Sequence, residues 1–298
     1  MKERPNIVCI GEVLWDLLPE GPQLGGAPSN LACHVAGLGG RATLISRVGD
    51  DDLGRRALSM LSGKGVDVSR VVVDSAAPTG TVGVTLEGQG QPKFTIHERV
   101  AWDRLTADGA GREAVGRADA VCFGSLAQRT PEARAAVQAL VGGVPSGAVV
   151  VCDINLRAPF YDKATLERSM ELATVVKLND GELGVLGGFF GLEGSQEAQA
   201  EGLARRFGLE AVLLTLGAEG SRLWTGGRWV VEPGRQVSVR DTIGAGDSFT
   251  AAYLVGRLKG WDPAATLRHA AGIAAYVCTQ AGATPDLPPD LLRPFLEG

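Results

Sequence analysis

The stretch Asp241-Thr-Ile-Gly-Ala-Gly-Asp247, followed by Ser248-Phe-Thr-Ala-Ala-Tyr-Leu254, combines an extended approach, a tight glycine turn and an apolar helix. Gly244 and Gly246 let the backbone turn without a Cβ penalty and leave successive amide N–H groups pointing outward. A helix that begins there adds unpaired N–H groups and the positive end of its dipole, a geometry that binds phosphate. The stretch therefore favours an anion site with the Asp247 carboxylate beside it. The alternative is that Asp247 only complements the helix dipole.

The composition is that of an ordinary well-packed globule. Of 298 residues, 45% are apolar and 21% are charged, and the net charge is −5. This charge, and the absence of any basic run longer than two adjacent arginines, argue against a nucleic-acid partner. We also expect no membrane span and no signal peptide, because no apolar run is long enough to cross a bilayer and the first residues lead directly into a strand-like run.

The cysteines are scattered, odd in number and mostly inside apolar runs, without a CxxC pair. They are Cys9, Cys33, Cys122, Cys152 and Cys278. Zinc ligation and a disulfide framework are therefore both disfavoured. The simplest interpretation is that they are core residues of a protein in a reducing compartment, and we expect the cytoplasm.

Strand-like and helix-like segments alternate along most of the chain. The predicted strands of this pattern are residues 7–10, 42–48, 120–123, 149–152, 175–178 and 211–215, with two β-rich pieces at 222–224 and 229–231. The predicted helices are residues 31–38, 53–61, 110–118, 131–141, 166–173, 181–186, 196–207, 248–258 and 263–278. Such alternation indicates an α/β fold with a parallel sheet covered on both faces. Without a repeat or a low-complexity linker, residues 1–298 are expected to form a single domain.

Two segments depart from this alternation. Residues 12–24 are mixed and rich in Pro and Gly, and residues 71–103 hold short β-rich runs split by the turns Ala77-Pro-Thr-Gly80 and Glu87-Gly-Gln-Gly-Gln-Pro92. We interpret the second segment as antiparallel hairpins inserted into the parallel scaffold. Both segments are expected to contribute to a small β lid on one side of the domain.

Polar and glycine-rich loops follow the predicted strands. They are Asp16 and residues 25–30, 124–125, 153–157, 179–182, 215–220 and 241–247. The ligand crevice of an open parallel sheet lies at the carboxyl ends of its strands, so these loops predict a small-molecule site at one edge. A Walker loop, a GxGxxG fingerprint after the first strand and protein-kinase motifs are all missing. Phosphate binding would therefore depend on the turn at residues 244–247.

Two polar groupings near this edge each allow two interpretations. In Asp153-Ile-Asn-Leu-Arg157 a period of two would put Asp153, Asn155 and Arg157 on one face, as a binding surface or as a solvated strand end. Asn179 and Glu182 lie three residues apart at a helix start, where they share a face. They suit either water-mediated Mg²⁺ binding or helix capping by Asn179.

Taken together, these motifs resemble the ribokinase-like sugar kinases, also called the pfkB carbohydrate kinase family, over nearly the whole chain. The resemblance rests on five motifs in the family's order: Gly25-Gly-Ala-Pro-Ser-Asn30 with Leu38-Gly39-Gly40, Val48-Gly-Asp-Asp51, Lys177-Leu-Asn-Asp-Gly-Glu182, Thr215-Leu-Gly-Ala-Glu-Gly220 and Asp241–Asp247. It implies a three-layer αβα fold with a small β lid, and an ATP-dependent kinase that phosphorylates the primary hydroxyl of a sugar.

The resemblance also implies a role for each matched residue. Asp247 corresponds to the general base, and the N–H groups of Gly244, Ala245 and Gly246 correspond to the anion hole for the transferring phosphoryl group. Asn179 and Glu182 correspond to the Mg²⁺–phosphate site. The other ATP positions are Thr215, Gly217, Gly220, Gly244 and Gly246. A monovalent-cation site for K⁺ would use Asp241 and the carbonyl of Ile243, with backbone from around Cys278 and Ala283.

The sugar is expected to be fructose, because Gly-Gly-Ala-Pro and Asp-x-Asn-x-Arg resemble the fructokinase branch. The expected substrate-binding residues are Asp16, Gly25, Gly26, Asn30, Arg99, Asp103, Asn155, Arg157 and Asp247. Arg99 and Arg157 could instead pair with a sugar-acid carboxylate, as in 2-keto-3-deoxygluconate kinases. Ribose and nucleosides are weaker alternatives, a sugar- or nucleotide-binding regulator is the non-enzyme alternative, and a homodimer could form through the lid.

Overall fold

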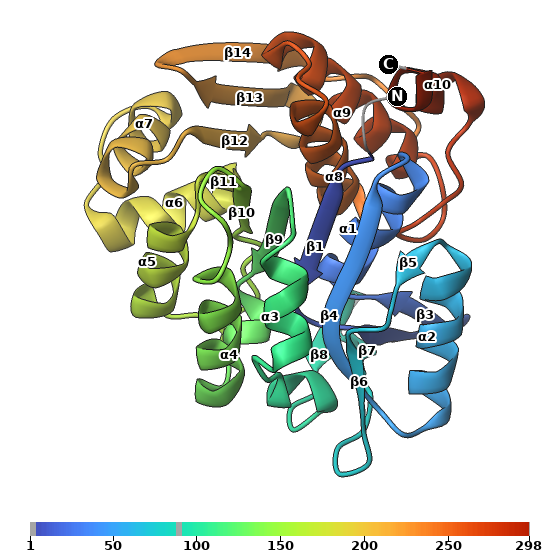
Figure 1. The fold of residues 1–298 in the computed structure, drawn as a ribbon. Helices are drawn as coiled ribbons and strands as arrows, with labels where there is room; N and C mark the ends of the chain where they lie inside the picture. The colour runs from blue at the N-terminus through green and yellow to red at the C-terminus, as the bar shows by residue number, and fades with distance from the viewer. Residues whose placement is uncertain (1–3, 88–90, 298) are drawn as a thin grey trace.

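The computed structural model describes residues 4–87 and 91–297, which form two sheets and the helices around them (Figure 1). The large sheet has ten strands in the order β14-β13-β12-β11-β10-β9-β1-β4-β5, and β6 also pairs with β4. Its strands are β1 (Asn6–Ile10), β4 (Arg41–Gly49), β5 (Val66–Asp67), β6 (Val71–Asp74), β9 (Ala120–Gly124), β10 (Val149–Asp153), β11 (Val175–Asn179), β12 (Ala211–Thr215), β13 (Gly220–Thr225) and β14 (Arg228–Pro233). All pair in parallel except β13 and β14, which form an antiparallel edge.

Two helical layers cover the two faces of this sheet. One layer comprises α1 (Ala27–Gly37), α2 (Asp52–Gly63), α8 (Ala245–Leu258), α9 (Pro263–Cys278) and α10 (Pro289–Glu297). The other comprises α3 (Gly109–Val115), α4 (Pro131–Val141), α5 (Lys163–Leu172), α6 (Asp180–Phe190) and α7 (Gln196–Phe207). The central strand β1 shows why both layers form, because Ile7 and Cys9 are buried in the first core, and Val8 and Ile10 in the second.

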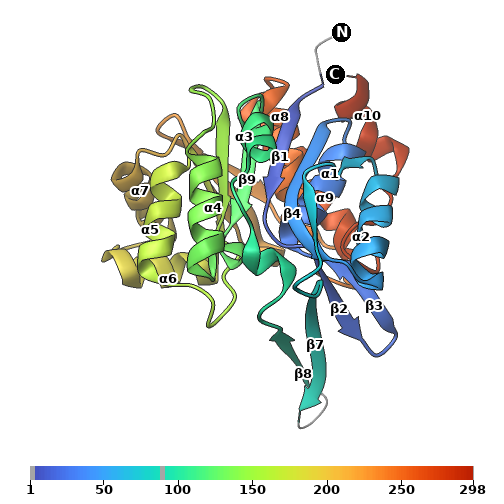
Figure 2. The same cartoon turned by 60° about the horizontal axis from the view of Figure 1, so that its bottom comes forward.

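The small sheet projects from one edge of the body (Figure 2). Its strands are β2 (Leu14–Leu18), β3 (Gly21–Gly25), β7 (Gly80–Glu87) and β8 (Gln91–Ile96), in the order β3-β2-β7-β8. Two antiparallel hairpins are joined by the parallel pair β2 and β7. The buried Trp15 fastens β2 to the body, since its indole N–H donates to the Leu53 carbonyl at 3.0 Å. This second sheet suits a lid.

The predicted α/β architecture is confirmed, with corrections to particular segments. The predicted lid segment 71–103 has bounds that are too wide. The strand β6 pairs in parallel with β4 of the large sheet, and residues 101–104 form the short helix η2 (Ala101–Arg104) against the body. The strands β2 and β3 and the helix α10 were not predicted. Within the described ranges, no helix is long and apolar enough to cross a membrane.

Candidate active site

A cavity lies where the carboxyl ends of central strands meet the first turns of α1 and α8. Its polar lining includes Glu12, Ser125, Asp153, Asn155 and Asp247, and its apolar lining includes Pro28, Leu31, Phe123 and Leu126. The strands β1, β9 and β10 are adjacent and parallel, so the loops that follow them are brought to the same edge. The structure therefore has a cavity at the edge where the sequence predicts a small-molecule site.

In this cavity Asp247 connects an early and a late motif of the chain. Its Oδ2 accepts a hydrogen bond from Asn30 Nδ2 at 2.9 Å, so the predicted motifs at residues 25–30 and 241–247 are in direct contact. Burial, followed by repulsion from Asp153, raises the pKa of Asp247 to about 6, although the Asn30 hydrogen bond and the charges of Lys177 and Arg157 act in the opposite direction. A half-buried carboxylate whose pKa is raised to about 6 suits a general base better than a solvated dipole partner.

The turn before Asp247 presents unpaired N–H groups. Gly244 adopts φ 77°, and a Cβ there would collide with the carbonyl oxygen of Ala283, so only glycine fits. The Ala245 N–H already donates to the Thr242 carbonyl at 3.3 Å. Within the described residues, the N–H groups of Gly244, Gly246 and Asp247 have no such acceptor. The N–H groups best placed to bind an anion are therefore those of Gly244, Gly246 and Asp247. The sequence predicted Ala245 in place of Asp247.

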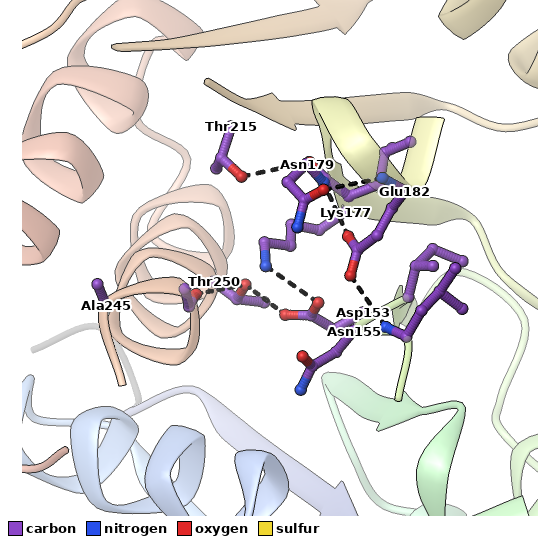
Figure 3. Close-up of polar contacts among 12 residues, drawn as sticks. Asp153, Asn155, Lys177, Asn179, Glu182, Thr215, Ala245 and Thr250 are labelled. Carbon is purple, nitrogen blue, oxygen red and sulfur yellow. Dashed lines mark hydrogen bonds and ion pairs between the residues drawn. The ribbon is translucent and has the colours of Figure 1, made fainter. Parts of the chain in front are cut away.

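A buried ion pair lies beneath this turn (Figure 3). Lys177 Nζ is 3.1 Å from Asp153 Oδ1, and Thr250 Oγ1 donates to Asp153 Oδ2 at 2.9 Å. A Cβ on Gly246 would lie 3.0 Å from Lys177 Nζ, so the ammonium group reaches the underside of the turn. Burial lowers the pKa of Lys177, but the attraction of Asp153, Glu182 and Asp247 outweighs it and the net pKa is raised. Lys177 therefore stays charged.

Sequence reasoning assigned no site role to Lys177, although a signal was present. A lysine in the middle of the apolar run Val175-Val-Lys-Leu178 is buried only if it is paired. The predicted alternation of Asp153, Asn155 and Arg157 is wrong, because β10 ends at Asp153 and Asn155 adopts φ 36°. Asp153 therefore forms the ion pair with Lys177, and Asn155 lines the cavity. Arg157 is exposed, but its charge is close enough to act on Asp247.

Asn179 and Glu182 cap helix α6 reciprocally. Asn179 Oδ1 accepts from the Glu182 N–H, and Glu182 Oε2 accepts from the Asn179 N–H, both at 2.8 Å (Figure 3). Glu182 Oε1 accepts from the Leu156 N–H at 2.9 Å. Burial raises the pKa of Glu182 even though Lys177 opposes it. Each oxygen keeps a further lone pair, so these residues fit an Mg²⁺ ion held through water as well as a cap. Across residues 4–87 and 91–297, no cluster of three or more His, Cys, Asp or Glu forms a direct metal site.

The predicted sugar contacts lie in two places. Asp16 on β2 approaches Gly25, where a Cβ would lie 2.7 Å from Asp16 Oδ2, and burial raises the pKa of Asp16 despite the charge of Arg157. Gly26 lies against the Glu12 carbonyl, since a Cβ there would be 2.5 Å from that oxygen. These glycines let the lid strand and the first loop pack directly on the start of α1.

The lid-side residues Arg99 and Asp103 do not join this group. Arg99 is exposed, with φ 60°. Both oxygens of the buried Asp103 bind Arg129, with Nε at 2.6 Å and Nη2 at 2.7 Å, and Oδ2 also accepts the Val100 N–H at 3.1 Å. This geometry argues against Asp103 as a sugar ligand, since its hydrogen-bonding capacity is used within the protein.

The expected nucleotide and cation positions show mainly structural contacts. The Thr215 hydroxyl donates to the Leu178 carbonyl at 3.3 Å, and Gly217 and Gly220 adopt φ 55° and 102° around the short helix η4 (Gly217–Glu219). The Asp241 carboxylate accepts the Ile243 N–H at 2.9 Å and the Gly282 N–H at 3.2 Å.

The two carbonyls expected near the monovalent cation are also engaged. Cys278 O accepts two backbone N–H groups, those of Arg240 and Asp241. Ala283 O accepts a hydrogen bond from the buried His34 at 2.9 Å. Of the suggested cation ligands, the Ile243 carbonyl is therefore the one for which no internal partner was found among the described residues.

Comparison with known proteins defines the class of this enzyme. The chain belongs to the pfkB family of carbohydrate kinases, which it matches over residues 6–290. It is 32% identical to a sugar kinase of Pyrococcus horikoshii (93% of this chain and 91% of that protein) and 31% identical to fructokinase-1 of Zea mays (96% and 95%). The structure of the P. horikoshii sugar kinase in complex with ATP has a TM-score of 0.82 at 30% identity, with 98% of both chains covered. Fructokinase from Vibrio cholerae O395, bound to fructose, ADP and calcium ion, has a TM-score of 0.81 at 28% identity, covering 98% of this chain and 99% of that one.

Proposed function

We propose that this sugar kinase transfers the γ-phosphoryl group of ATP to the primary hydroxyl of D-fructose and forms fructose 6-phosphate. The observation that carries the proposal is the half-buried Asp247 carboxylate, bound to Asn30 and adjoining a turn of unpaired N–H groups. The choice of fructose is supported by the fructokinases among its relatives, from Zea mays and Klebsiella pneumoniae.

The geometry suits an in-line transfer between two bound substrates. Asp247 takes the proton of the attacking hydroxyl, that oxygen forms a bond to the γ-phosphorus, and the bond to the ADP oxygen breaks. The N–H groups of Gly244, Gly246 and Asp247 face the charge that develops on the phosphoryl oxygens. Lys177 adds a positive charge beneath the same turn.

The proposal includes two cations and the residues that would hold them. Asn179 and Glu182 would hold Mg²⁺ through water, and that ion would neutralise charge on the ATP phosphates. Asp241 and the Ile243 carbonyl would serve K⁺, while Thr215, Gly217 and Gly220 would line the nucleotide side. The homodimer through the lid stays a prediction.

A second acceptor class is favoured by one observation. The positive charge of Arg157 opposes the rise in the pKa values of Asp16, Glu12 and Asp247, so it acts on three carboxyl groups of the sugar side. Such a charge would also attract the carboxylate of a sugar acid such as 2-keto-3-deoxygluconate. Arg99 has no comparable effect on these carboxyl groups.

A coupled ADP-release assay tests the proposal across fructose, ribose, 2-keto-3-deoxygluconate, tagatose and nucleosides. We expect the highest kcat/KM for fructose, and Asp247→Asn should lower kcat by about 10²–10⁴-fold because the general base is lost. Asp52→Asn is the matched control, since Asp52 is an exposed acid in the first turn of α2 and its change removes only a dipole effect and an exposed ion pair with Arg55.

Three results would contradict parts of this proposal. Retained kcat in Asp247→Asn would remove Asp247 from the role of base. A higher kcat/KM for the sugar acid would identify that substrate instead of fructose. ATP binding without phosphorylation of any member of the panel would support the regulator.

A further inference from the structure

Glu12 is a buried carboxyl group whose burial the fold alone does not explain. It follows β1 at the loop Gly11-Glu12 and is only 3% exposed. Its Oε2 atom is buried and has no hydrogen-bond partner within the described residues. Leaving such an acceptor unpaired costs free energy, so an unpaired oxygen in a packed site calls for a partner that the protein itself does not supply.

The Glu12 carboxyl group lies close to the start of α1. Burial raises the pKa of Glu12 to about 7, and hydrogen bonds from its own backbone N–H and from that of Ala27 act against the rise. Ala27 is the first residue of α1, whose N-cap Gly26 offers no side chain. The Glu12 carboxyl group therefore lies beside the first N–H group of α1, while its Oε2 is left without a partner.

The free oxygen belongs to a residue that lines the proposed reaction cavity. Glu12, Asp153, Asn155 and Asp247 line the same cavity, and the negative charge of Asp247 acts directly on Glu12. With three carboxyl groups, the polar lining is rich in acceptors. A ligand that offers hydroxyl donors is satisfied there, whereas an anionic group at this end would meet repulsion.

We propose that Glu12 is a substrate-binding residue whose Oε2 accepts a hydrogen bond from an acceptor-sugar hydroxyl other than the one phosphorylated. This inference rests on the proposed sugar kinase function and deepens it. It predicts that Glu12 and Asp247 together select the uncharged, hydroxyl-bearing end of the sugar, and that any sugar-acid carboxylate must lie toward Arg157.

The test is a cycle between Glu12 variants and monodeoxy sugars. Wild type, Glu12→Ala and Glu12→Gln are assayed with fructose and with 1-, 3- and 4-deoxyfructose, or with the monodeoxy analogues of whichever sugar the wild type phosphorylates best. Glu12→Ala should raise the KM for the parent sugar by on the order of 10- to 100-fold, the range expected for a hydrogen bond to a charged group, while the KM for ATP changes less than about twofold. For one deoxy sugar the same variant should cost less than about threefold, because the partner hydroxyl is already absent.

Controls separate the possible failures. Glu12→Gln keeps the side-chain shape and an acceptor oxygen, so it should fold like the wild type and lose less than Glu12→Ala. Glu171→Ala, which changes an exposed glutamate on α5, should leave both KM values unaltered. An equal penalty of Glu12→Ala on the parent sugar and every analogue would overturn the inference, since Glu12 would then act only on α1 or Asp247. Absence of any phosphorylated sugar with the wild type would instead overturn the proposed function.

Discussion

At the scale of single residues, Asp247 combines a catalytic requirement with a cost in stability. Its pKa is raised from an ordinary value of 3.8 to about 6, chiefly by burial. Because a general base must be ionised, kcat/KM should fall about tenfold per pH unit below pH 6. A profile that stays flat down to pH 5 would show that Asp247 is not the titrating base.

The same shift sets the sign of a stability effect. An acid whose folded-state pKa lies above its unfolded-state value binds more protons in the folded state, so stability falls as pH rises from about 4 to 6. Asp247→Asn cannot ionise, and its advantage in unfolding free energy should grow over that window to on the order of 2–3 kcal/mol and then stay constant. Urea denaturation of both proteins at pH 4, 5, 6 and 7 measures the difference. A constant or shrinking difference would contradict the assigned shift.

Site residues could be predicted from the sequence where neighbouring residues form a recognisable motif, and were missed where they do not. Asp247 and Asn30 lie in glycine-rich motifs with recognisable chemistry, and the structure joins them. Glu12 and Lys177 were missed because what marks them as site residues is their burial, and burial depends on contacts with distant parts of the chain. The pairing of Asp103 with Arg129 could not be foreseen, because Arg129 comes from another segment and no sequence signal near Asp103 indicates it.

At the scale of elements, the turn before α8 offers a controlled comparison of two glycines. Gly244 and Gly260 adopt φ 77° and 76°, but a Cβ would strike the Ala283 backbone at Gly244 and meet nothing within 4 Å at Gly260. Gly260→Ala should therefore cost only about 1–2 kcal/mol of left-handed strain and leave kcat unchanged. Gly244→Ala should cost more and lower kcat by over about 100-fold, because the anion-binding N–H groups move.

Thermal unfolding and steady-state kinetics on both variants decide the matter. Equal losses of kcat, or full activity in Gly244→Ala, would show that the turn tolerates displacement and does not depend on Gly244. A larger loss of stability in Gly260→Ala would contradict the role of the Ala283 contact.

Element boundaries were predictable where the sequence carries its own start and stop signals. The bounds of α4 and α9 were predicted correctly, each with a proline in its first turn after a capping Thr130 or Asp262. The strands β2 and β3 lack such signals, since Pro19 between them and the Pro and Gly residues of β3 imitate a loop. Likewise β6 looked like part of the lid because its sequence does not reveal its parallel pairing with β4.

At the scale of the whole molecule, one buried arginine connects the lid to the body. Arg129 is stacked over the Trp102 ring at 3.9 Å, binds both oxygens of Asp103 and donates to the His97 carbonyl at 2.7 Å, just beyond β8. Trp102 in turn packs against Gly80, the first residue of β7, where a Cβ would overlap the indole. Both strands of the longer lid hairpin are therefore held at their bases by the same cluster.

We expect Arg129→Met to lower the unfolding free energy by about 3–5 kcal/mol, because Asp103 would be left as a buried, unpaired charge. The double variant Arg129→Met/Asp103→Leu should lose less than the sum of the single variants, since it removes both charges. Arg134→Met is the matched control: its side chain is 33% exposed and pairs with a half-exposed Asp162, so the cost should stay below about 1 kcal/mol. If the cluster positions the lid, the double variant should also raise the KM for the sugar more than the KM for ATP, as denaturant melts and steady-state kinetics would show. Equal changes in the two KM values would confine Arg129 to a role in stability, because a lid that covers the sugar must affect the sugar first.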